Sequence, residues 1–240
     1  MQGFGMLIES KNMETEKTLP EITRDIELTS FEDKDEILRR KELWHEAGYR
    51  QYPDGNWLIS MYCPMPGVTA DMVNWWFWWH PQASERYQSW FPGEHFSITT
   101  DKKDKDYFSS PSLPAFQPNT QYPVEKVGSV KMPLRIDFVT PEGFGFSPEA
   151  VKDSSIATIV NGHVGAFKGA VYHTEMAHMF FQEEGGLLLV TRFWMGMLLK
   201  NKAMRKAILT EETAKCMTVH CMREYRNLCE MLPGLYRENA

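Results

Sequence analysis

Hydrophobic residues recur with helical spacing between Thr210 and Pro233, and this pattern predicts a long helix near the C-terminus. At 100° per residue, one arc of that helix carries mainly apolar side chains; its members are Thr213, Met217, His220, Cys221, Glu224, Leu228 and Met231. A buried carboxylate is costly unless a cation or a metal compensates it. Glu224 and His220, one turn apart, are therefore candidate ligands of a divalent ion, the alternative being an ordinary hydrogen-bonded pair.

The first half of the chain has several shorter patterns. Acids early and bases late predict a helix over 32–46. The alternating stretch 49–65 contains a Pro-Asp-Gly turn and predicts a hairpin. A second helix is expected to begin after Thr69 as N-cap and to run to Pro81, whereas the charged and Ser/Pro-rich stretch 98–120 predicts a long surface loop or lid.

Residues that favour β-structure dominate 124–139 and 154–194, and the Glu-Glu-Gly-Gly sequence at 183–186 is typical of a hairpin turn. These patterns predict an α+β fold in which a curved antiparallel sheet is covered by the long C-terminal helix, with further helices in the N-terminal part. We expect residues 21–240 to form a single domain and residues 1–20 to form a flexible N-terminus.

Composition narrows the classes of function. The net charge is −6 and the chain has no long basic run, which argues against a nucleic-acid partner. No stretch approaches the roughly 18 apolar residues that span a bilayer, and no secretion signal is recognisable, so we expect a cytoplasmic protein without a membrane partner. The four cysteines, at 63, 216, 221 and 229, form no CxxC pair and are expected to be free thiols.

The segment 75–95 contains five tryptophans and two histidines. Aromatic walls suit a flat or aromatic substrate, although a tryptophan-rich helix buried against the sheet explains each tryptophan equally well. His95 follows a Pro-Gly turn, where the backbone can direct a ligand. His80 precedes Pro81, where it is expected to bond the terminal carbonyls of the helix.

Four segments of the chain resemble the 2,4-diacetylphloroglucinol hydrolases, a family that includes phloretin hydrolases. They are MPGVTADMVNWWFWWHPQASERYQSWFPGEH (65–95), VEKVG (124–128), HMFFQEEGGLLLVTRFWMG (178–196) and HCMREYRNLCEMLPGLY (220–236). The expected α+β fold is then of the helix-grip, Bet v 1-like kind. The resemblance implies cleavage of the carbon–carbon bond between an acyl carbonyl and a phloroglucinol-type ring, which leaves a carboxylate and the deacylated phenol.

The resemblance also implies one zinc ion per chain, held by two histidines and two glutamates. The matching positions are His95, Glu125, His220 and Glu224, and Glu94 and Glu142 are alternatives to Glu125. Two imidazoles and two carboxylates suit zinc or a similar divalent ion.

Two further positions match catalytic residues of the family: Tyr87, expected to face the substrate, and His178, with His173 as the alternative. Tyr87, Trp90 and Phe193 are the expected substrate-binding residues. Ile98 stands where a polar residue is expected to bind a ring hydroxyl, which indicates a substrate with a different acyl chain or ring.

The sequence thus predicts a zinc-dependent hydrolase acting on a small acylated phenol. Two other functions remain open: a non-catalytic protein that binds an apolar aromatic ligand, and a zinc-dependent ester or amide hydrolase. A homodimer is a further expectation.

Overall fold

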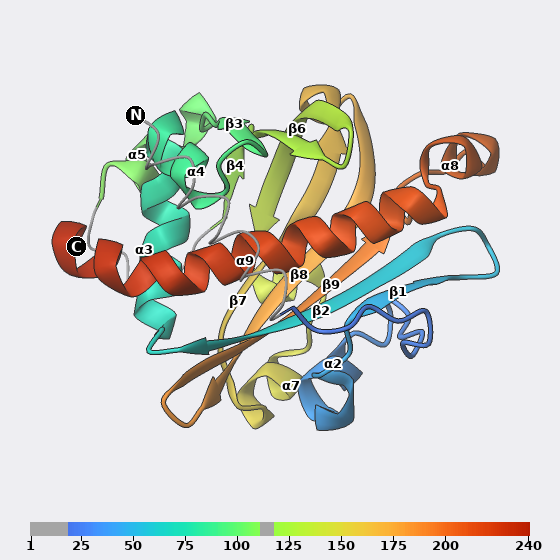
Figure 1. The fold of residues 1–240 in the computed structure, drawn as a ribbon, viewed down its shortest axis with the longest axis horizontal. Coiled ribbons are helices and arrows are strands. Elements are labelled where there is room, and N and C mark those ends of the chain that lie inside the picture. The colour runs from blue at the N-terminus through green and yellow to red at the C-terminus, as the bar shows by residue number, and fades with distance from the viewer. Residues whose placement is uncertain (1–18, 111–117) are drawn as a thin grey trace, which may run out of the picture.

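A computed structural model of the chain describes residues 19–110 and 118–240, so most of the expected flexible N-terminus lies outside the described residues. Nine strands form one sheet in the order β1-β2-β9-β8-β7-β6-β5-β3, and β4 pairs with β6 (Figure 1). The strands are β1 (Gly48–Gln51), β2 (Trp57–Pro66), β3 (His95–Ser97), β4 (Asn119–Gln121), β5 (Val124–Val127), β6 (Val130–Val139), β7 (Ile156–Ala166), β8 (Val171–Glu183) and β9 (Gly186–Met195). Every strand pairing is antiparallel, as expected.

The predicted hairpins are confirmed. β1 and β2 flank the Pro-Asp-Gly turn, and β8 and β9 flank the turn before Gly186. Side chains alternate across the sheet because successive residues of a strand point to opposite faces. In β8, Met176 and Phe180 belong to the hydrophobic core on one face, whereas Ala177 and Met179 belong to the core on the other. Both faces of the sheet are therefore covered.

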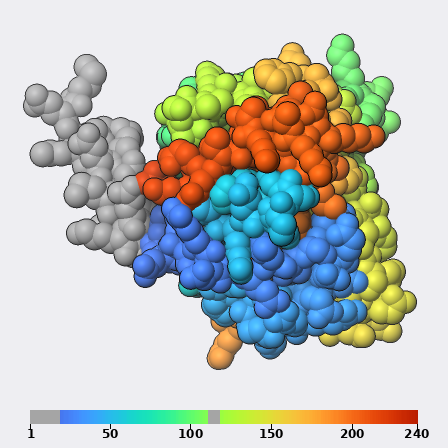
Figure 2. All heavy atoms as spheres, turned by 90° about the vertical axis from the view of Figure 1, so that its right-hand side faces the viewer, coloured from blue at the N-terminus to red at the C-terminus, as the bar shows by residue number. Residues whose placement is uncertain are grey.

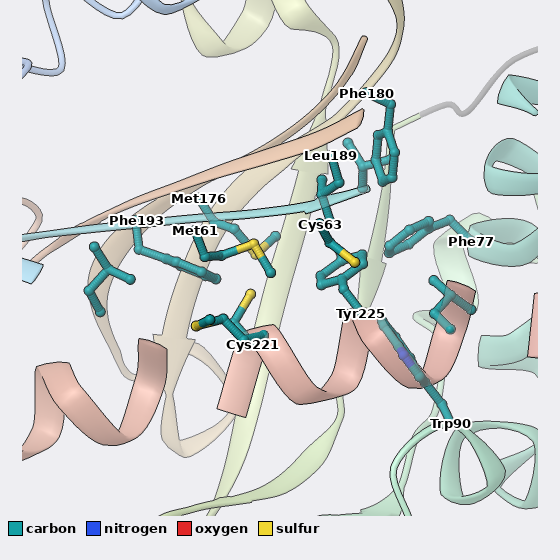
Figure 3. Packing of buried hydrophobic residues seen from close by; sticks show 14 of the residues in the cluster. Met61, Cys63, Phe77, Trp90, Met176, Phe180, Leu189, Phe193, Cys221 and Tyr225 are labelled. Atoms are coloured by element: carbon teal, nitrogen blue, oxygen red, sulfur yellow. The ribbon is translucent and has the colours of Figure 1, made fainter. Parts of the chain in front are cut away.

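The long helix α9 (Glu211–Asn239) lies across one face of the sheet, as predicted (Figure 1). Thr210 is its N-cap, and the hydroxyl accepts from the Thr213 backbone N–H. Figure 3 shows Cys221 and Tyr225 rising from α9 towards the strands. The predicted arc placed Glu224 among its apolar members. In the structure the buried stripe centres on Cys221 and Tyr225, so Glu224 lies at the side of this stripe.

The helix also continues through Pro233, beyond the end of the predicted segment. Proline removes one backbone hydrogen bond from a helix. Leu232 is fully buried, and the Tyr236 ring packs edge-on against Trp75 at 5.3 Å. These contacts hold the last turns in place in spite of the missing bond.

The remaining helices are all shorter than α9. They are α2 (Asp35–Arg39), η1 (Lys41–Leu43), α3 (Ala70–Trp79), η2 (His80–Gln82), α4 (Ser84–Trp90), η3 (Lys102–Asp104), α5 (Lys105–Phe108), α6 (Pro141–Phe144), α7 (Pro148–Asp153), η4 (Phe167–Gly169) and α8 (Lys202–Ile208). The N-cap of α3 is Thr69, as predicted. In Figure 2 the C-terminal segment (orange-red) lies against the β1–β2 hairpin (cyan), and the Trp57 indole donates to the carbonyl of Leu209 at 3.1 Å.

Two predicted segments differ from the structure. The helix expected over 32–46 is interrupted at Arg40, whose extended backbone lets its guanidinium bond Glu27 and Glu42. The loop expected over 98–120 contains η3 and α5 and ends in β4, although 111–117 lie outside the described residues. β4 forms because its polar side chains are satisfied in the sheet; the Thr120 hydroxyl, for example, donates to Asp137 at 2.7 Å.

The predicted α+β architecture is confirmed: an antiparallel sheet curves around a long C-terminal helix. All four cysteines are free thiols, also as predicted. Over 19–110 and 118–240, no helix combines the length and the apolarity that a bilayer crossing requires.

Candidate metal centre and its cavity

The four predicted ligands come from three elements that the fold brings together. His95 begins β3 directly after a turn in which Gly93 has a φ of +86°, a conformation that side chains other than glycine rarely adopt. β3 pairs with β5 so that His95 stands opposite Glu125. His220 and Glu224 lie one turn apart on the flank of α9 that faces this pair. The register of β3 with β5 and the one-turn spacing on α9 thus bring the four side chains together.

The distances within this cluster are those of ligands around one ion. A Glu224 carboxylate oxygen lies 3.3 Å from Nε2 of His95 and 3.6 Å from Nε2 of His220. Ligand atoms about 2.0–2.1 Å from a zinc ion at tetrahedral angles lie about 3.3–3.4 Å apart. The ligand atoms of His95, His220 and Glu224 all lie within 4.8 Å of one another. These three residues therefore have the spacing of a zinc site.

The hydrogen bonding of the two histidines supports a metal. Nε2 of His95 and both ring nitrogens of His220 are buried without a hydrogen-bond partner among the described residues. Buried polar atoms without partners are costly, and an ion between them removes that cost. Nδ1 of His95 lies 3.1 Å from the carbonyl oxygen of Tyr87, which can only accept. That bond keeps the proton on Nδ1 and leaves the lone pair of Nε2 directed at the cluster.

Glu125 lies at the edge of the cluster. One of its oxygens is 3.9 Å from Nε2 of His220, and the other accepts a hydrogen bond from the Tyr87 hydroxyl. Of the two alternatives, Glu94 lies 3.9 Å from Nδ1 of His220, on the other ring nitrogen. Glu142 is exposed in α6 and makes no contact with the cluster. Glu125 and Glu224 both lie near Nε2 of His220. The geometry therefore favours Glu125 over Glu94 as the candidate fourth ligand.

Charge interactions keep the cluster ready to bind a cation. Burial opposes ionisation of Glu224, but the imidazoles of His220 and His95 outweigh it and lower the pKa of Glu224 to about 2. Burial likewise opposes protonation of His220, but Glu224, Glu125 and Glu94 together raise the pKa of His220. A proton on His220 therefore partly neutralises these carboxylates when no metal is bound.

A cavity opens beside the cluster, between α9 and the sheet. The space between its side chains totals about 570 Å³, including the part that opens to solvent. Its walls are mostly apolar and come from α3, η2, α4, β4, β5, β6, β7, β8, β9 and α9. The predicted substrate-binding residues Tyr87, Trp90 and Phe193 all line it, and Figure 3 shows Trp90 and Phe193 on either side of Tyr225. The Trp90 indole also donates to the Glu224 carbonyl at 2.6 Å, which links the cavity wall to the cluster.

His178 lines the cavity from β8. Its Nδ1 lies 2.9 Å from the Thr191 hydroxyl, and its ring packs edge-on against Phe193 at 5.6 Å. Burial lowers the pKa of His178 to about 4, so its imidazole is neutral at neutral pH. The alternative, His173, is not among the cavity-lining residues and lies 2.7 Å from the Thr174 hydroxyl.

The strand pattern around His178 was partly wrong. Strict alternation along the strand predicts that Tyr172, Thr174, Met176 and Phe180 share the face of His178. A register shift between β7 and β8 instead reverses the alternation near His173. The Tyr172 hydroxyl donates to Asp137 instead, on the face opposite the cavity. Met176 and Phe180 do share the face of His178, as predicted.

Two polar residues of the cavity were missed as site residues. His80, expected only to end a helix, does bond the Trp76 carbonyl but also lines the cavity. Gln121 lies in β4, directly after the stretch expected to be a loop, and its amide nitrogen donates to Asn119 at 3.0 Å. A histidine directly after a run of tryptophans was the available signal for His80; nothing local marks Gln121.

A buried group of metal-ligand side chains beside an aromatic cavity is typical of metal-dependent enzymes with small flat substrates. The family model described as the DAPG hydrolase PhiG domain matches residues 28–237. The chain therefore belongs to the 2,4-diacetylphloroglucinol (DAPG) hydrolase family, and the resemblance stated from the sequence is confirmed.

Individual relatives agree with this assignment. The chain is 32% identical to the 2,4-diacetylphloroglucinol hydrolase of Pseudomonas protegens, over 91% of this chain and 76% of the relative. It is 26% identical to the phloretin hydrolase of Eubacterium ramulus, over 87% and 78% of the two chains. A solved structure from Chromobacterium violaceum covers 73% of this chain and 97% of its own, with a TM-score of 0.42 and 8% identity.

Proposed function

We propose that this protein is a zinc-dependent hydrolase of acylphloroglucinols, which it cleaves between the ring carbon and the acyl carbonyl. The observation that carries the proposal is that the buried Nε2 atoms of His95 and His220, both without a hydrogen-bond partner among the described residues, face Glu224 at the spacing of zinc ligands. Membership of a family with named 2,4-diacetylphloroglucinol and phloretin hydrolases supports the choice of substrate. His95, Glu125, His220 and Glu224 would hold the ion.

When bound, the ion supplies Lewis-acid chemistry: it polarises a carbonyl or lowers the pKa of a water from 15.7 towards about 7. Trp90 and Phe193 orient the aromatic ring beside the cluster. Water adds its oxygen to the acyl carbon, and the bond from that carbon to the ring then breaks. The electron pair passes to the ring carbon, where the ring hydroxyls delocalise it as an enolate.

The chain must then move one proton to the ring carbon. His178 begins neutral, because burial lowers its pKa to about 4. It therefore acts first as a base, taking a proton from the water or from a ring hydroxyl, and afterwards returns that proton to the ring carbon. The Tyr87 hydroxyl donates a hydrogen bond to Glu125. This bond fixes the Glu125 carboxylate and holds the Tyr87 ring next to the bound substrate. Water thus supplies hydroxide to the acyl product and a proton to the phenol.

We further propose that the preferred substrate carries a larger acyl group than acetyl. Ile98, Met176 and Phe193 contribute apolar surface to the cavity. An acyl chain that carries an aromatic or long aliphatic group buries more apolar area there, at about 25 cal/mol per Å². We therefore expect phloretin-type ketones to be better substrates than diacetylphloroglucinol.

The test is incubation of zinc-loaded protein with a panel of acylphloroglucinols, phloretin and the corresponding phenyl esters, with products identified by mass spectrometry. Release of free phloroglucinol from a ring ketone supports the proposal. Hydrolysis of the esters alone would reassign the protein as an ester hydrolase, and tight binding of the ketones without any product would make it a binding protein.

A further inference from the structure

His80 is a buried polar residue of the cavity for which the mechanism above has no use. It begins η2 and is 1% exposed. Its ring stacks on Trp76 at 4.9 Å and on Tyr87 at 5.8 Å, and Trp90 packs edge-on against it at 5.4 Å. Aromatic rings on three sides fix its orientation, so its two ring nitrogens have defined directions.

The hydrogen bond of one ring nitrogen determines the state of the other. Nδ1 lies 2.8 Å from the carbonyl oxygen of Trp76. A carbonyl only accepts, so Nδ1 carries the hydrogen and Nε2 has a free lone pair. Burial lowers the pKa of His80 to about 3, which keeps the ring neutral. Within 19–110 and 118–240, no side chain or backbone group donates to Nε2, although His80 lines the cavity.

Most other polar groups that line the cavity already have a hydrogen-bond or ion-pair partner. The Tyr87 hydroxyl donates to Glu125, and Glu224 faces the two histidines of the cluster. The Gln121 amide nitrogen donates to Asn119. Nε2 of His80 is therefore a rigid hydrogen-bond acceptor within the aromatic wall that has no protein donor. A phenolic hydroxyl in the plane of a bound ring is the kind of donor that such an atom recognises.

We propose that Nε2 of His80 accepts a hydrogen bond from one ring hydroxyl of the phenolic substrate and thereby selects rings that carry that hydroxyl. This role rests on the proposed function but adds a specificity residue to it. A site with a buried acceptor rejects an analogue that lacks the donor, because the acceptor then stays unpaired. Loss of the contact should lower kcat/KM by about 10- to 100-fold.

Two substitutions separate this role from a structural one. In His80→Asn the side-chain amide can replace Nδ1 and keep the bond to Trp76, but no acceptor reaches the position of Nε2. In His80→Gln the longer side chain can place its amide oxygen near that position. His45→Asn, an exposed histidine on the other side of the sheet, is the matched control for the chemical change.

The experiment measures kcat/KM of the zinc-loaded proteins for a 2,4,6-trihydroxyphenyl ketone and for its analogues lacking one ring hydroxyl. We expect His80→Asn to lower kcat/KM by about 10- to 100-fold for the parent ketone, and much less for the analogue that lacks the hydroxyl bound by His80. The kcat/KM of His80→Gln should lie closer to that of wild type. Equal losses on every substrate, or a greater loss for His80→Gln than for His80→Asn, would overturn the proposal. Zinc content and circular dichroism identify a variant that fails to fold.

Failure of the proposed function would be visible separately. If the wild-type protein cleaves no member of the panel, quenching of tryptophan fluorescence by the same phenols measures their binding directly. The role of His80 then stands if one hydroxyl strengthens binding to wild type but not to His80→Asn, and it falls if no such difference exists.

Discussion

Zinc and a proton compete for His220, so the stabilisation by zinc should increase with pH. The carboxylates of Glu224, Glu125 and Glu94 outweigh burial and raise the pKa of His220 above its ordinary value of 6.5. A zinc ligand must be a neutral imidazole, and binding therefore displaces this proton. Glu224, with a pKa of about 2, is already ionised throughout the neutral range and releases none.

One displaced proton changes the apparent zinc affinity tenfold for each pH unit below the pKa of His220, or about 1.4 kcal/mol. For a domain of this size, 1 kcal/mol shifts Tm by about 2–4 °C. At pH values below the pKa of His220, the zinc-induced rise in Tm should thus grow by about 3–6 °C for each pH unit. The zinc-free protein should change in the opposite direction, because a raised pKa contributes stability that is lost as pH rises through it.

The assay is thermal unfolding at a buffered free zinc concentration across this pH range, with zinc-free protein alongside. Glu94→Gln is the matched variant: it removes one carboxylate beside Nδ1 of His220 but leaves the proposed zinc ligands intact. In that variant the pKa of His220 is raised less, so the zinc-induced rise in Tm should stop increasing at a lower pH than in wild type. A zinc-induced shift that stays constant or shrinks from pH 6.5 upwards would refute the competition at His220.

Three further substitutions test other parts of the structure. His178→Ala should retain zinc but lose about 10²-fold or more in turnover, because it removes the proton carrier; unchanged turnover measured on zinc-loaded protein would eliminate that role. Glu125→Gln should weaken zinc binding by about 10- to 100-fold in a chelator competition assay, a loss that Glu142→Gln should not reproduce if Glu125 is the fourth ligand. Leu189→Ala, at a fully buried position, should lower the free energy of unfolding by about 2–5 kcal/mol in denaturant titration, and a loss under 1 kcal/mol would contradict the tight packing of this core.

Local patterns predicted the elements whose sequence preferences agree with their tertiary contacts. The periodicity between 210 and 233 predicted the C-terminal helix, and the alternation in 49–65 predicted the first hairpin. The arc of α9 was displaced because Tyr225 is fully buried and aligns the helix with the sheet. The helix expected over 32–46 is interrupted at Arg40, where the backbone is extended. The buried Trp44 indole donates to the Ile37 carbonyl, which a continuous helix would use for its own backbone hydrogen bond.

Less of the candidate metal site could be predicted from local sequence patterns. Helical spacing alone proposed His220 and Glu224, because both residues lie on one element. His95 and Glu125 lie thirty residues apart, and only the register between β3 and β5 places them opposite each other. Their assignment therefore depended on the family resemblance. His80 was missed because its tertiary surroundings, and not its position at a helix end, place it in the cavity.

The central claim is that side chains from β3, β5 and α9 hold one ion. Its most direct test is the zinc content of purified wild-type protein and of His220→Ala, measured by elemental analysis beside cleavage of an acylphloroglucinol. We predict about one zinc per wild-type chain, and neither zinc nor activity in the variant. A variant that keeps its zinc, or a wild-type protein that is fully active without metal, would contradict the account.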